Sequence, residues 1–110
     1  DNTISSYCNV NAMRADTPAT MAMLNVDCQG QMWVHDSAIA QTIDLPLTVV
    51  KGQWFKFLST GGDITVDPNS DGGTSNTLNG GTGALTRSTN NEIYTVIAID
   101  SNKWIISNPA

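Results

Sequence analysis

Hydrophobic and polar residues alternate along most of the chain, in short runs separated by turn-forming residues. The alternation is clear in QWFKFLS, where Phe55 and Phe57 have the same parity, and in EIYTVIAID. A period of two is typical of a β-strand with one buried face. Connections such as CQGQ, STGGD and DSNK are rich in turn formers. The pattern predicts about eight or nine short strands, at 4–13, 20–28, 31–35, 43–50, 53–59, 63–67, 84–87, 92–100 and 103–108.

One segment also carries a helix signal. Thr17 before Pro18 is a usable N-cap followed by proline at the first helical position. The alternation of Met21 and Met23 against Leu24 nevertheless continues to the end of the predicted strand. We therefore predict a strand over 20–28 and limit any helix to one or two turns near 16–20.

Strand number and composition together predict an all-β fold. The chain has nine aspartates and a single glutamate, Glu92, and asparagine, threonine, serine and glycine dominate 59–91. These residues favour turns and strand surfaces over helices. A chain of 110 residues has no room for a second core. We predict one domain, a jelly-roll-like antiparallel β-sandwich of about eight strands over residues 1–110.

Two of the predicted strands are apolar on both faces. In a two-layer sandwich each strand needs one wetted face, so a second layer must cover these strands. The cover is either a loop of the same chain or another subunit. The opposed parities in 92–100 are Ile93, Thr95, Ile97, Ile99 and Tyr94, Val96, Ala98. We favour a subunit interface and assign to it Tyr94, Val96, Met21 and Met23.

Charge excludes several classes of partner. The net charge is -5 and the five basic residues are scattered, whereas nucleic acid and anionic lipid require a basic surface. No apolar run reaches the ~18 residues of a membrane span. We expect no nucleic-acid partner and no membrane insertion.

The stretch DPNSDGG raises the question of a metal site. Asp67, Asn69 and Asp71 place oxygen atoms at alternate positions before a glycine, as in the first half of a calcium-binding loop. The same residues are typical of a surface turn. A calcium loop needs a bidentate glutamate at its twelfth position, which is Leu78 here. The sequence favours a turn, and we predict no metal.

The two cysteines leave two alternatives open. Cys8 and Cys28 have the parity of the apolar residues in their strands, so we expect both to be buried. They are either free thiols, which we favour, or a disulfide between the first two strands, which requires an oxidising compartment. A zinc site is disfavoured because His35 is the only histidine and no CxxC motif exists.

Catalytic context is weak throughout the chain. No G-x-S-x-G motif occurs, and His35 stands beside Asp36 at the end of a strand, where we expect a solvated turn histidine. The single glutamate argues against a pair of glycosidase carboxylates. We therefore predict a non-enzymatic protein without a cofactor.

The tryptophans are the candidates for ligand binding. Trp33, Trp54 and Trp104 lie inside apolar strands, where packing in the core or an interface is the default. They could instead form a sugar-stacking platform. Trp54 has the parity of Lys56 and is the best candidate for exposure, so the binding candidates are Trp54 and Trp33.

Residues 53–108 contain a strand, an Asp/Asn/Gly turn, a TLNG segment, an LT pair and a final Trp-bearing strand. The residues that carry this pattern are Gly72, Leu78, Asn79, Gly80, Leu85, Thr86, Tyr94, Asp100 and Trp104. The pattern resembles the tip domains of bacteriophage tail needles, tail fibres and head fibres. It implies a homotrimeric β-sandwich knob on a fibrous stalk, located at the tip of a virion appendage and contacting a host-surface glycan, lipopolysaccharide or protein.

Under this reading, residues 1–110 are the C-terminal part of a longer fibrous protein, with any stalk upstream of Asp1. The alternative function is a monomeric carbohydrate-binding module of a secreted bacterial protein, and a small secreted hydrolase is a third possibility. A trimer would also supply the second cover for the strands that are apolar on both faces.

Overall fold

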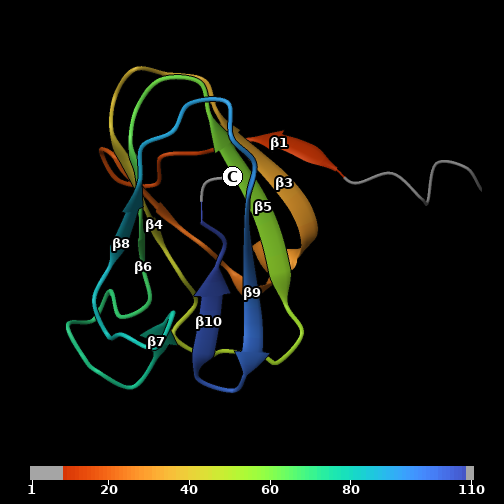
Figure 1. Cartoon of the computed structure of the whole chain (residues 1–110), viewed down its shortest axis with the longest axis vertical. Helices are drawn as coiled ribbons and strands as arrows, with labels where there is room; N and C mark the ends of the chain where they lie inside the picture. Colours follow the sequence, from red (N-terminus) through yellow and green to blue (C-terminus); the bar gives the residue numbers. More distant parts are fainter. Residues whose placement is uncertain (1–8, 109–110) are drawn as a thin grey trace, which may run out of the picture.

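Ten strands form two β-sheets that face each other across a shared core in the computed structural model, which describes residues 9–108 (Figure 1). The six-stranded sheet has the order β1 (Val10–Ala12), β3 (Gln29–His35), β5 (Trp54–Ser59), β9 (Tyr94–Asp100), β10 (Lys103–Ile106) and β7 (Thr77–Leu78). The four-stranded sheet has the order β2 (Thr20–Ala22), β4 (Gln41–Asp44), β6 (Ile64–Asp67) and β8 (Leu85–Arg87). The all-β prediction is confirmed.

Helical structure in the described part of the chain is a single 3-10 turn, η2 (Asn25–Cys28). It lies within the strand predicted at 20–28, which in fact ends at Ala22. The predicted helical turn near 16–20 is instead a tight turn, closed by two backbone hydrogen bonds between Thr17 and Thr20. No helix among these residues is long and apolar enough to cross a membrane.

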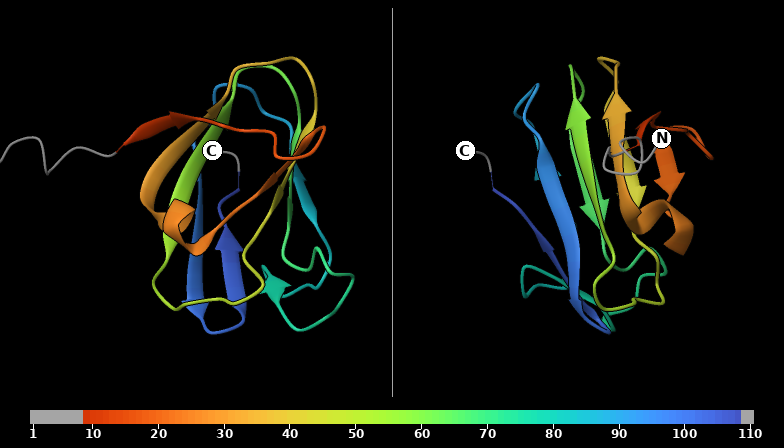
Figure 2. Two further views of the ribbon diagram at one scale, coloured as in Figure 1. Left: turned by 180° about the vertical axis from the view of Figure 1, so that it is seen from behind. Right: turned by 90° about the vertical axis from the view of Figure 1, so that its right-hand side faces the viewer.

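Successive strands of the N-terminal half alternate between the two sheets. The strands β1, β3 and β5 pair in parallel in one sheet, and β2, β4 and β6 pair in parallel in the other. Val10 is the partner of Met32, and Trp33 is the partner of Phe57, so each coil takes about 22 to 24 residues. In Figure 2 the right-hand view shows β9, β5 and β3 side by side (blue, green and orange).

This solenoid-like stacking corrects the predicted antiparallel jelly roll. Five of the eight strand pairings are parallel. Antiparallel pairing is confined to β5 with β9, β9 with β10, and β6 with β8. Parallel neighbours require a crossover connection, and in this chain the crossover runs through the opposite sheet.

Alternating burial along the strands builds the core. The six-stranded sheet contributes Phe55, Phe57 and Trp104, each at most 1% exposed, and the rings of Phe57 and Tyr94 stack with centroids 5.3 Å apart. The four-stranded sheet contributes Ile43 and Val66, both fully buried. Each sheet therefore covers the apolar face of the other.

The residues predicted to form a subunit interface lie in this core. Each of these four side chains is at most 4% exposed, namely Tyr94, Val96, Met21 and Met23. Their cover is the opposite sheet of the same chain, so their assignment to an interface is wrong.

The free edge of β2 is occupied by charged side chains. The Ala22 N–H donates to Asp16 Oδ2 (3.0 Å), and Arg14 Nη2 donates to the Ala22 carbonyl (2.8 Å). The same guanidinium forms ion pairs with Asp27 (2.6 Å) and Asp16 (3.1 Å). These groups take the hydrogen-bonding positions that another strand would use, which limits edge-to-edge pairing.

Candidate functional site

The solvent-facing side of the six-stranded sheet carries an apolar surface, which we call the outer face. Ile97 is the register partner of both Trp54 and Ile105, so the three side chains form a row across β5, β9 and β10. Ile97 is 37% exposed, Ile105 is 36% exposed and Ile99 is 47% exposed. The outer face continues over the partly exposed or exposed residues Val10, Met32, Val34, Lys56 and Leu58. Contiguous apolar surface of this kind marks an interaction site in many proteins.

The three tryptophans occupy different environments. Trp54 is partly exposed on the outer face, with Lys56 Nζ 5.8 Å from its ring centroid, as expected for the best stacking candidate. A β-bulge puts Gly30 beneath this indole, and a Cβ there would lie 3.1 Å from Trp54 Cζ2. Trp104 is fully buried.

The other predicted binding residue, Trp33, is 7% exposed and lies inside the molecule. Its Nε1 donates to the Asp27 carbonyl (3.2 Å), and the Arg14 guanidinium is 5.7 Å from its ring centroid. No ring face is open for a ligand to stack on. The structure therefore leaves Trp54 alone as a stacking candidate.

The DPNSDGG segment is a turn built by its own side chains, as predicted. Asp67 Oδ1 accepts the Asn69 N–H (2.9 Å), and Asp71 Oδ1 accepts the Gly73 N–H (2.9 Å). Asn69 is buried and holds the following loop through Asn76. One side-chain oxygen of each of Asp67, Asn69 and Asp71 thus accepts a backbone N–H. Within residues 9–108, no group of three or more His, Cys, Asp or Glu side chains could hold a metal ion.

The TLNG segment has a definite local geometry. Leu78 is 1% exposed, and Asn79 adopts φ 52°, a left-handed conformation that asparagine tolerates. The Asn79 carboxamide donates to the Ile106 carbonyl (3.1 Å) and accepts the Ile106 N–H (2.9 Å). This side chain extends the hydrogen bonding along β10 beyond the two residues of β7.

His35 and Cys28 are both structural residues. His35 is 9% exposed and its Nε2 lies 2.5 Å from the Ile39 carbonyl, so the prediction of a solvated histidine is wrong. Cys28 is a fully buried free thiol, as favoured, and burial, with a smaller effect of Asp27, raises its pKa to about 12. Cys8 lies outside the described residues.

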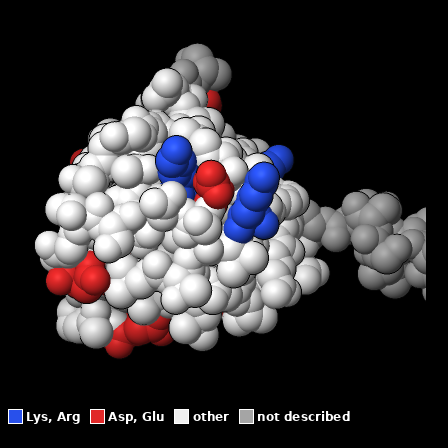
Figure 3. All heavy atoms as spheres, turned by 90° about the horizontal axis from the view of Figure 1, so that it is seen from below, with Lys and Arg blue, Asp and Glu red and all other residues white. Residues whose placement is uncertain are grey.

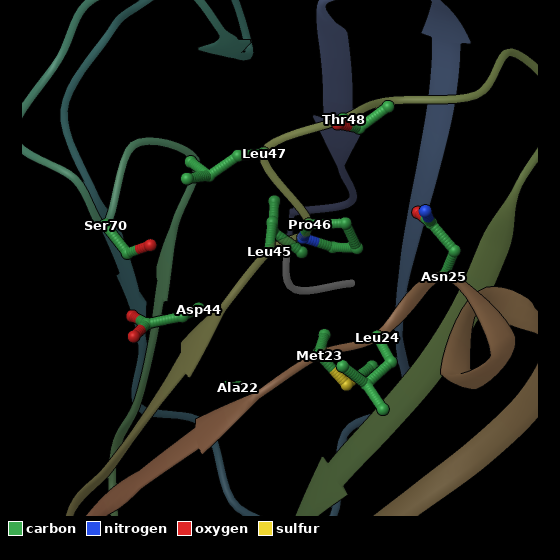
Figure 4. Close-up of a pocket in the computed structure, with 10 residues that line it drawn as sticks. All are labelled: Ala22, Met23, Leu24, Asn25, Asp44, Leu45, Pro46, Leu47, Thr48 and Ser70. Carbon is green, nitrogen blue, oxygen red and sulfur yellow. The ribbon is translucent and has the colours of Figure 1, made fainter.

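A groove of about 350 Å³ runs between residues 22–25 and 44–48, where β2 and β4 diverge (Figure 4). Its lining is mainly aliphatic, and its polar members are Asn25, Asp44, Thr48 and Ser70. Burial, followed by the negative charge of Asp67, raises the pKa of the Asp44 carboxyl. Sequence reasoning missed this groove because its walls come together only when the two strands pair.

The surface carries few charges. Figure 3 shows one end of the molecule, where basic and acidic side chains are scattered over a mainly uncharged surface. Comparison of the sequence with models of known protein families and with curated proteins finds no match.

Proposed function

We propose that the protein is a non-enzymatic knob domain at the tip of a phage tail needle or fibre, which assembles as a homotrimer and contacts a component of the host cell envelope. The observation that carries the proposal is the outer-face row of Trp54, Ile97 and Ile105, whose side chains face solvent on a single chain. Burying the same patch from each subunit around one axis would remove it from water.

The resemblance of residues 53–108 to phage tip domains is the second support. Several residues that carry it have specific roles in this fold: Leu78 packs in the core, Asn79 bonds to Ile106, and Trp104 is fully buried. The self-association surface proposed here uses other residues than those assigned from sequence, since it lies on the opposite face of β9.

Ile97→Asp is expected to dissociate the assembly. A charge in the centre of a buried apolar interface is strongly unfavourable, and a central anchor contributes ~2 kcal/mol or more to association. Light scattering should give a mass near three times 11.7 kDa for the wild type and near 11.7 kDa for the variant. Far-UV circular dichroism should be unchanged, because Ile97 faces away from the core.

The matched control is Ile39→Asp, which places the same charge at an isolated loop residue that is 70% exposed. This variant should retain the wild-type mass. A wild type that remains monomeric at micromolar concentration would contradict the trimer, as would an unaltered mass for the Ile97 variant.

The second candidate function is a monomeric carbohydrate-binding module, favoured by the partial exposure of Trp54 beside Lys56. On this hypothesis Trp54→Ala should weaken glycan binding at least tenfold, because an indole face supplies the stacking surface for a sugar ring. Calorimetric titration with the best ligand from a glycan array measures the change. Leu58→Ala on the same strand and face is the control and should bind as the wild type does. Loss of binding in both variants would argue for general disruption of the face rather than stacking on Trp54.

A further inference from the structure

The groove between residues 22–25 and 44–48 is built differently from the outer face. Met23, Leu45 and Pro46 form its buried apolar part, whereas Leu24 is 58% exposed and Leu47 is 45% exposed. In Figure 4 Leu24 and Leu47 come from opposite walls, and Asp44 lies with Ser70 at one side. Its volume, about 350 Å³, falls within the range of ~300–1,000 Å³ typical of small-ligand pockets.

The groove also has an uncompensated negative charge at one side. Asp44 is the register partner of Asp67 on the adjacent strand, so two carboxylates stand side by side on the sheet. The ion pairs within residues 9–108 join Arg14 to Asp16 and to Asp27, and none of them involves Asp44 or Asp67. A cation placed against Asp44 would offset the repulsion between these carboxylates.

The walls of the groove favour an extended peptide as the occupant. Residues 45–48 follow β4 outside any strand, and residues 22–25 lead from β2 into η2, so both walls are chain segments that diverge after the hydrogen bond from the Met23 N–H to the Asp44 carbonyl (2.8 Å). Asn25 and Ser70 add a carboxamide and a hydroxyl, which suit the N–H and C=O groups of a peptide backbone. The net charge of -5 favours approach of a basic segment.

We propose that this groove binds a segment of a partner protein that inserts an aliphatic side chain between Leu24 and Leu47 and sets an adjacent lysine or arginine against Asp44. The site goes beyond the proposed function, because it lies at the ends of β2 and β4 and not on the outer face. It requires no particular oligomeric state.

The test is a titration of the full chain with acetyl-Leu-Lys-Leu-amide, followed by ¹⁵N–¹H NMR. The lysine peptide should shift the amide signals of Leu24, Asp44 and Ser70. It should bind at least tenfold more tightly than the glutamine counterpart, and the glutamate counterpart should bind more weakly still. Asp44→Asn should abolish the preference for lysine over glutamine. This variant should fold at least as well as the wild type, because it removes one of two neighbouring like charges.

Two further variants make the experiment specific. Asp100→Asn removes an exposed carboxylate elsewhere and should leave binding unchanged, whereas Leu47→Ser should weaken all three peptides by removing apolar contact at the rim. The proposal is overturned if the three peptides bind equally, if the Asp44 variant keeps the lysine preference, or if the shifted signals lie outside the groove. Binding of hexylammonium as tight as that of the peptide would replace the peptide partner with a small amine.

Discussion

Asn69→Ala should lower the free energy of unfolding by about 3 kcal/mol or more, because two buried backbone groups and one partly buried group would lose their partner. Asn69 Nδ2 donates to the carbonyls of Asn76 (2.8 Å) and Thr82 (2.9 Å), and Asn69 Oδ1 accepts the Asn76 N–H (3.0 Å). Leaving a buried polar group unsatisfied costs ~1–3 kcal/mol. Urea denaturation followed by tryptophan fluorescence measures the loss.

The matched control for this change is Asn90→Ala, an exposed asparagine in a turn, which should stay within about 0.5 kcal/mol of the wild type. If the Asn69 variant also unfolds within that range, the hydrogen bonds of Asn69 do not organise the loop. The measurement thereby separates a structural role of the DPNSDGG segment from a merely permissive surface turn.

Gly62→Ala should destabilise the fold by about 1–3 kcal/mol, or more, through a single added methyl group. A Cβ at this position would lie 2.1 Å from the Ile39 carbonyl oxygen and 2.5 Å from its carbon. Both are backbone atoms, so relief requires the loop at 36–40 to move. That movement would disturb the hydrogen bond from the Gly62 N–H to the Ser37 carbonyl (2.7 Å).

Gly83→Ala is the control, because a Cβ there meets no atom within 4 Å and its φ lies outside the left-handed region. This change should be neutral or slightly stabilising, since alanine restricts the unfolded chain. Thermal unfolding of the two variants side by side gives the comparison. Equal midpoints would show that the contact between residues 36–40 and Gly62 is not tightly packed.

Alternation along the sequence predicted the positions and faces of the longer strands. It succeeded because every second residue is buried in both β5 and β10: Phe55 and Phe57 share one parity in β5, and Trp104 and Ile106 share one parity in β10. It overextended the strands at 20–28 and 43–50. In the first, the apolar parity continues into the 3-10 turn η2, and in the second, β4 ends at Asp44, two residues before Pro46, which lacks an N–H for a ladder.

Strand pairing was not predictable from the same pattern. Alternation identifies the buried face of a strand but not the strand that pairs with it. The short polar connectors are typical of turns between antiparallel strands, so they favoured the wrong pairing. A signal was present in the spacing of core positions, since Met21, Ile43 and Val66 recur every 22 or 23 residues and lie in register. The residue types differ from coil to coil, so the structural repeat has no visible sequence repeat.

The candidate sites, like the fold, were predictable from the sequence only in part. Parity separated the two faces of β9 correctly, but both are apolar, and the sequence contains nothing that says which face meets the opposite sheet. The partial exposure of Trp54 followed from its parity with Lys56. The groove at Asp44 could not be foreseen, because it forms where two paired strands separate.

The alternating path of the chain has a consequence for how the domain folds. Each parallel pair joins residues about 22 to 26 positions apart, so a loop must close before any of its backbone bonds form. The hairpin of β9 and β10 is local and can form early, but β9 is also the partner that completes β5. During synthesis on a ribosome, the central strand β5 can therefore pair with its second neighbour only after the residues of β9, which begins at Tyr94, have emerged. We expect slow, late folding in one cooperative step, with truncated chains lacking the last two strands unable to retain a partial core.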